Sequence, residues 1–246
     1  MIDYLAHLRR DGAAVAALAR EQDLTTPVRS CPGWTLAHLV GHLGTVHRVQ
    51  AVRAGAGSAE RLDPDRPTPP ATGLADWYEE GLVDLMAVLE RTDPAAPAWN
   101  WSPDAPKVAA FWSRRMAQET VVHRWDGEDA IGRATPIDPT LAADGIDEWL
   151  TVFLPVDAAD PDIAVPEGAG TLHLHTTDAD GEWWASLAGR TLTVRREHAK
   201  ADVAARGPAG DLLLVCWRRL PLDTVDAVDV VGDRSVLDAW LSFPDN

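Results

Sequence analysis

Glu119 and His123 stand four residues apart in the stretch RMAQETVVHRWD, residues 115–126. Residues at this spacing project from the same face of an α-helix, so a helix here would hold the carboxylate beside the imidazole. Two interpretations fit the spacing. The pair is a solvated helical contact, or it is half of a metal site that needs at least one more ligand from another element.

The segment TLAHLVGHLGTVH, residues 35–47, offers histidines for that missing ligand. His38 and His42 share a helix face, whereas His47 is rotated away from them. His42 lies beside the apolar stripe of this helix and could therefore point into a helical bundle. With Glu119 and His123 it would complete a set of two histidines and one carboxylate, which leaves coordination positions open as a catalytic centre does. The alternative is a histidine at the edge of the core that is bonded to a backbone carbonyl.

Apolar residues at helical spacing predict the elements that would position these side chains. The first half of the chain is predicted to form a four-helix bundle, whose helices run over residues 3–21, 36–54, 74–91 and about 107–131. Thr35 is expected to cap the second helix. Bundles commonly build sites from side chains on facing helices.

The second half of the chain alternates short strand patterns with helices, which is typical of a small α+β domain. A helix near 139–153 precedes strand patterns in TLHLHTTD, GEWWASLAG, TLTVRRE and ADVAARG, then a helix in PAGDLLLVCWRRL, a strand in AVDVVGD and a final helix in SVLDAWLSF. DADG, residues 178–181, reads as a hairpin turn. We therefore predict two domains, residues 1–136 and 137–246.

The charge balance narrows the class of partner. The formal net charge is -16 over 246 residues, so nucleic acid and anionic membranes are not expected to bind. The N-terminus does not resemble a signal peptide, and no apolar run is long enough to span a membrane. Cys31 and Cys216 form no CxxC motif, and both are expected to be small buried residues rather than nucleophiles. These features predict a soluble cytoplasmic protein.

Four motifs carry a family resemblance along the whole chain, in the expected order. They are SCPGWTLAHLVGHL, RRMAQETVVHRWDGEDAIG, GTLHLHTTDADGEWW and ARGPAGDLLLVCWRRLP. In this combination the chain resembles the mycothiol-dependent maleylpyruvate isomerase family. The resemblance implies a DinB-like metal-binding four-helix bundle, followed by a C-terminal domain of the sterol-carrier-protein-like type. It also implies that His42, Glu119 and His123 bind one divalent metal ion of the zinc type.

The family's chemistry uses mycothiol, a low-molecular-weight thiol, as its cofactor. The resemblance implies that the metal ion favours the thiolate, which adds to the double bond of an electrophile such as maleylpyruvate. Rotation about the new single bond and elimination of the thiol then give the trans isomer. A mycothiol S-transferase is the alternative enzyme. A non-catalytic bundle that binds metal or a ligand is the alternative outside enzymes, and His38 as a fourth ligand would favour it. Hydrolysis by a metal-bound hydroxide would need a general base that the sequence does not identify.

Further residues have two interpretations each. The resemblance assigns a substrate-binding role to Arg219, where Arg218 replaces the family's preceding glycine, but a solvated helix end fits as well. Asp126 is either a partner for a ligand imidazole or a surface residue. His173 and His175 face the same side of a strand, where packing between domains is favoured over metal binding, and His198 is expected to be solvated. A monomer or a homodimer fits the sequence.

Overall fold

The computed structural model describes residues 2–243 and divides into two compact units. The first comprises residues up to Asn100 together with Ala105–Pro136, and the second comprises Trp101–Asp104 and the chain from Ile137 onward. The two-domain fold class predicted from the sequence, a helical bundle followed by an α+β domain, is confirmed. Within residues 2–243, no helix is both long and apolar enough to cross a membrane.

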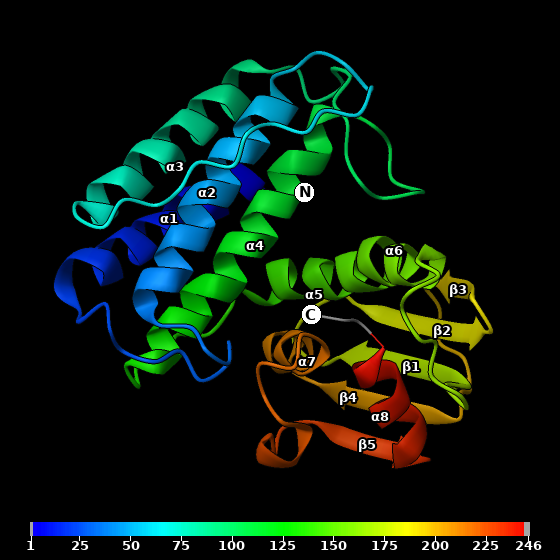
Figure 1. Ribbon diagram of the computed structural model, residues 1–246. Helices are drawn as coiled ribbons and strands as arrows, with labels where there is room; N and C mark the ends of the chain where they lie inside the picture. The colour runs from blue at the N-terminus through cyan, green and yellow to red at the C-terminus, as the bar shows by residue number, and fades with distance from the viewer. Residues whose placement is uncertain (1, 244–246) are drawn as a thin grey trace. The chain divides into compact units, whose positions relative to one another are not determined.

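The first unit is a bundle of long helices that lie side by side (Figure 1). Its helices are α1 (Tyr4–Glu21), α2 (Leu36–Ala54), α3 (Leu74–Arg91) and α4 (Ala109–Ala130). Helix α2 packs mainly against α3, and α1 packs mainly against α4. Thr35 is the N-cap of α2 as predicted, and its backbone amide donates to Nδ1 of His38 at 3.1 Å.

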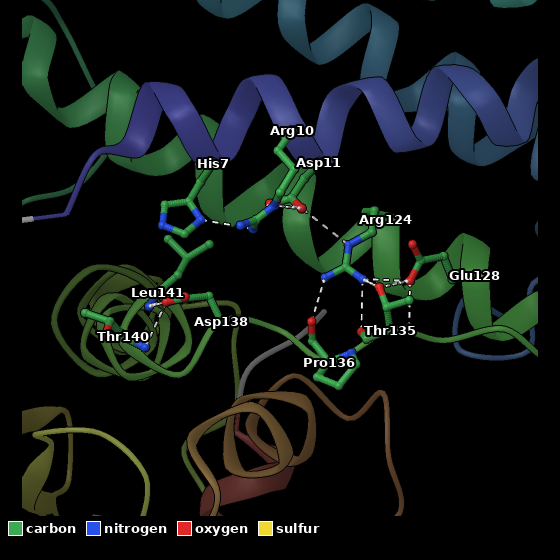
Figure 2. A network of polar contacts seen from close by, with 10 residues as sticks. All are labelled: His7, Arg10, Asp11, Arg124, Glu128, Thr135, Pro136, Asp138, Thr140 and Leu141. Carbon is green, nitrogen blue, oxygen red and sulfur yellow. Dashed lines mark hydrogen bonds and ion pairs between the residues drawn. The ribbon is translucent and has the colours of Figure 1, made fainter.

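A buried ion network joins α4 to α1 and to the chain that follows α4 (Figure 2). The guanidinium of Arg124, 3% exposed, lies with Nε 3.5 Å from Oδ1 of the buried Asp11. Its Nη1 donates to Glu128 Oε2 at 2.6 Å and to the carbonyl oxygen of Thr135 at 2.9 Å. Because buried charges are tolerated only when they are paired, this network fixes how α4 lies against α1.

The second unit begins with a helical segment and continues as a mixed sheet (Figure 1). The predicted single helix over 139–153 is in fact α5 (Pro139–Glu148), a π-helical turn (Trp149–Phe153) and α6 (Leu154–Ala159). Trp149 in this segment is fully buried. Helix α6 contacts strand β3.

In the described chain, strands of the second unit form one five-stranded sheet in the order β3-β2-β1-β4-β5. The strands are β1 (Thr171–Thr176), β2 (Glu182–Ala188), β3 (Thr191–Arg195), β4 (Val203–Gly207) and β5 (Asp229–Gly232). β1 and β4 are parallel, and the other neighbouring pairs are antiparallel. The predicted DADG turn joins β1 to β2, where the Thr176 amide donates to the Gly181 carbonyl oxygen at 2.9 Å.

Two further helices complete the second unit. They are α7 (Ala209–Cys216) and α8 (Arg234–Ser242), with a 3-10 turn at Leu222–Thr224 between them. Helix α8 packs on β1 and β4, and α7 packs on β4 and α5. The predicted helix over PAGDLLLVCWRRL is shorter than expected, because Pro208 is its N-cap and the chain turns at Arg218, whose φ is +56°.

Candidate functional site

The structure brings His42 of α2 together with Glu119 and His123 of α4. One ligand atom from each side chain lies within 4.8 Å of the others. Nε2 of His42 is 2.9 Å from Oε1 of Glu119, and Nε2 of His123 is 3.5 Å from the same oxygen. The two imidazole rings meet edge to face, with centroids 5.0 Å apart. Two imidazole nitrogens and a carboxylate oxygen that converge in this way suit a divalent ion such as zinc.

Asp126 fixes the orientation of His123. Nδ1 of His123 donates to Oδ2 of Asp126 at 2.9 Å, and Asp126 is fully buried. The interpretation of Asp126 as a surface residue is therefore wrong. A carboxylate bonded to one ring nitrogen leaves the other free to bind a metal, which here is Nε2 on the side of Glu119.

Arg115 holds the other oxygen of Glu119. Its Nη2 donates to Oε2 at 2.8 Å, and Arg115 is 5% exposed. Burial opposes the charge of Glu119, but hydrogen bonds from His123 and His42 and the charge of Arg115 bring the pKa of this carboxyl well below its usual range. Glu119 is thus ionised, which is the form in which a carboxylate binds a metal ion. The sequence could have revealed Arg115, since it precedes Glu119 by one helical turn on the same face.

Trp34 and Cys31 also lie at the site, and sequence reasoning missed both. The ring of Trp34 stacks on His123 at a centroid distance of 5.8 Å and tilts against His42 at 5.0 Å. The Cys31 thiol is half-buried, 3.5 Å from Oδ2 of Asp126. The expectation of a buried cysteine holds for Cys216 alone, where burial raises the pKa of the thiol to about 12.

The remaining histidines of α2 serve other purposes. His38 is exposed and accepts the amide of Thr35 at the start of the helix, so it does not join the ligand cluster. His47 is fully buried, with Nε2 3.0 Å from Oγ1 of Thr120. Burial lowers the pKa of His47 to about 3, and the ring is therefore neutral.

A cavity of about 590 Å³ lies beside His42 in the helical unit. Trp34, just before α2, and His38, in its first turn, line one side of it. Arg66 and Pro69 line it from the connection between α2 and α3. A volume of this size accommodates a small-molecule ligand. Arg66 offers a guanidinium to a ligand that carries a carboxylate. The sequence did not identify this arginine, because its connection has no regular element to set the direction of its side chains.

Arg219, which the sequence resemblance assigns to substrate, follows α7 in the second unit. Its Nη1 donates to the carbonyl oxygen of Trp217 at 2.9 Å. Arg218 adopts the left-handed conformation that glycine favours. The role of Arg219 stays a prediction.

Comparisons with known proteins give matches along most of the chain. The family model described as the mycothiol maleylpyruvate isomerase N-terminal domain matches residues 5–127, and the MDMPI C-terminal domain matches residues 140–239. No curated protein matches the chain.

Two solved structures resemble this chain over nearly its whole length. One is a crystal structure of the mycothiol-dependent maleylpyruvate isomerase, with 15% identity, a TM-score of 0.55, and coverage of 94% of this chain and 93% of the other. The second is a histidine-to-alanine mutant of the mycothiol-dependent maleylpyruvate isomerase, with 15% identity, a TM-score of 0.54 and the same coverage. At this identity the likeness shows the fold.

Proposed function

Because this chain belongs to the mycothiol maleylpyruvate isomerase family, we propose that it is a thiol-dependent isomerase that uses mycothiol and a divalent metal ion. Its substrate on this proposal is a small electrophile of the maleylpyruvate type, whose cis double bond becomes trans. The observation that carries the proposal is the convergence of His42, Glu119 and His123 beside a ligand-sized cavity.

The donor set fits a catalytic ion of the zinc type. Three protein ligands leave a coordination position for an exogenous group, whereas structural zinc sites are usually closed by four. When bound, the ion supplies a positive charge that favours the thiolate form of a low-molecular-weight thiol at neutral pH.

The protein's own side chains would prepare this site. Asp126 keeps Nε2 of His123 directed toward Glu119, and Arg115 donates a hydrogen bond to the other oxygen of Glu119. The indole of Trp34 packs against the rings of both histidines. Arg66, on the wall of the cavity, would bind a substrate carboxylate. Arg219 is proposed as the second substrate-binding arginine, on the resemblance alone.

The location proposed for this enzyme is the cytoplasm. Both cysteines are free in the structure, and Cys31 lies beside the candidate ligands. A reducing compartment keeps such thiols unpaired. Both a monomer and a homodimer are compatible with the proposal.

The test is the conversion of maleylpyruvate to its trans isomer by the purified full-length protein, with mycothiol and zinc added or omitted singly. We expect turnover that requires both, about one catalytic zinc per active chain, and loss of turnover in Glu119→Gln but not in the control His7→Ala. Consumption of mycothiol with simple electrophiles, without isomerisation, would indicate an S-transferase instead. Metal that does not bind to the intact protein, or turnover that survives in Glu119→Gln, would contradict the proposal.

A further inference from the structure

A second cluster of imidazoles around a glutamate lies in the α+β unit. His173 and His175 are two residues apart on β1, so both side chains lie on one face of the sheet. Glu182, the first residue of β2, is the direct cross-strand neighbour of His175. His198 comes from the connection between β3 and β4. One ligand atom from each of the four side chains lies within 4.8 Å of all the others.

The imidazole nitrogens of this cluster surround one oxygen, Oε1 of Glu182. His173 Nε2 is 3.1 Å from it, His175 Nδ1 is 2.9 Å away and His198 Nδ1 is 2.5 Å away. A tetrahedral zinc ion with ligands at about 2.0–2.1 Å separates its donor atoms by roughly 3.3 Å. Movements of less than about 1 Å would therefore convert this arrangement into a coordination shell.

His173 provides an independent sign that the cluster is built to bind something. The residue is 6% exposed, and its Nε2 is buried without a hydrogen-bond partner among the described residues. Its approach to Glu182 lacks the alignment of a hydrogen bond, although the distance is short. A buried nitrogen that points into a cluster of donors and lacks a hydrogen bond is costly. A metal ion would use its lone pair.

We propose that His173, His175, Glu182 and His198 form a second divalent-metal site that takes one zinc-like ion. It is separate from the set of His42, Glu119 and His123, called the helical cluster below. Three imidazoles and one carboxylate provide the nitrogen and oxygen ligands that zinc accepts. Because all four positions come from the protein, the site is of the closed, structural kind. Glu182 differs in this respect from Asp126. Asp126 orients a histidine of the other cluster, whereas Glu182 would bind the ion itself.

The location of His198 indicates what the ion stabilises. In the strand order β3-β2-β1-β4, the connection from β3 to β4 has to pass β2 and β1. The carbonyl oxygen of Lys200 in this connection accepts the indole N–H of Trp184 at 3.2 Å. His198 lies in the same connection, and 79% of its side chain is exposed. Coordination by His198 would fasten the connection to the strands that it crosses.

Zinc binding to the full-length chain tests the proposal, in a background where the helical cluster is disabled by His42→Ala and Glu119→Ala. After treatment with a chelator, we expect calorimetric titration with zinc alone to give one ion per chain. Cobalt should give the intense visible absorption of four-coordinate geometry. Adding His198→Ala should weaken zinc binding at least tenfold, and adding His7→Ala should leave it unchanged.

His198 is exposed, so its replacement leaves the packing of the sheet intact and keeps the test independent of folding. His173→Ala is the stronger variant, and it should abolish binding. Hydrogen exchange gives a second readout, in which zinc should slow exchange of residues 196–202 in the background protein but not in its His198→Ala derivative. No zinc bound in the background protein, or equal affinity after His198→Ala, would overturn the proposal.

Discussion

The two units of this chain each gather imidazoles around one glutamate, but they do so with different secondary structure. In the helical unit, Glu119 and His123 are one turn apart on α4, and His42 comes from α2. In the α+β unit, His173 and His175 alternate along β1, and Glu182 faces His175 across the hairpin. Helical spacing brings ligands together within one element, whereas a sheet depends on the register between strands.

The clusters also differ in what surrounds them. The helical cluster has three donors, an orienting carboxylate on His123 and a cavity beside His42. The strand cluster has four donors, one of them on an exposed connection. An incomplete ligand set next to a cavity suits chemistry, and a complete set suits stability. Variants that separate these two roles test the comparison.

Matched removal of the two glutamates should have the largest effect. Loss of a hydrogen bond to a metal ligand lowers metal affinity or activity by about 10–100-fold. Glu119→Gln removes the charge of a ligand itself, so it should lower turnover by about 1000-fold or more. The fold-loss of turnover in Glu182→Gln should be at least ten times smaller than that in Glu119→Gln. The measurement is zinc content and isomerase rate for both variants. Equal losses of activity would mean that the two clusters do not have separate roles.

The buried ion network around Arg124 in the helical unit should give the next largest effect. Arg124→Met leaves Asp11 with Arg10 as its charged partner and leaves Glu128 without the guanidinium. Breaking a buried ion pair costs about 3–5 kcal/mol of unfolding free energy, and we expect the lower end because Arg10 remains. Urea unfolding of the helical unit within the full chain provides the measurement.

An exposed ion pair in the same unit is the control for Arg124. Arg9 pairs with Glu90, and their side chains are 63% and 47% exposed. Arg9→Met should cost about 1 kcal/mol or less, because solvent screens exposed pairs. If both variants cost the same, burial does not set the strength of the network in Figure 2.

Asp126→Asn should weaken the helical cluster without removing a ligand. The amide lacks the negative charge that His123 Nδ1–H now contacts, so zinc affinity should fall about 10–100-fold. Asp129→Asn, three residues later on α4, is the matched control and should leave affinity unchanged. Calorimetric titration with zinc measures the affinity of each variant. An unchanged affinity in Asp126→Asn would contradict the role of Asp126 in orienting His123.

The sequence predicted the helical part of this architecture well, since its information is local. Spacing within one helix placed Glu119 beside His123, and the stripe of α2 made His42 a candidate that the resemblance then selected. The sequence did not predict Trp34 and Cys31 at the site, because they lie in an irregular segment before α2 where no periodicity sets side-chain direction. The α1 to α4 pairing of Asp11 with Arg124 also depends on tertiary packing.

The strand cluster was harder to predict for a different reason. The alternation of His173 and His175 was visible, but the partnership with Glu182 depends on hairpin register, which the turn closed by Thr176 and Gly181 sets. His198 reaches the cluster from a connection whose path no pattern predicts. The expectation that His173 and His175 pack between domains stays a prediction.

The smallest effect is expected at the end of α7, on the unfolding free energy. The chain turns there in the same way as at the end of α4, but with a different residue in the turn. Gly132, at φ +69°, follows the end of α4, and Arg218, at φ +56°, follows the end of α7. In both, the next amide donates to the carbonyl five residues back, Arg133 to Glu128 at 2.8 Å and Arg219 to Leu214 at 2.7 Å. This is the hydrogen-bond pattern of a helix end that favours glycine.

Arg218→Gly should therefore stabilise the α+β unit. A left-handed conformation costs a residue with a Cβ roughly 1–2 kcal/mol, and glycine loses about 0.4–1 kcal/mol of this gain through its freer unfolded chain. We expect a net gain of about 0.5–1 kcal/mol in unfolding free energy over Arg218→Ala, which keeps the strain but removes the same side chain. Thermal unfolding of the two variants measures the difference. Equal stability of the two variants would show that the left-handed conformation at position 218 is not strained.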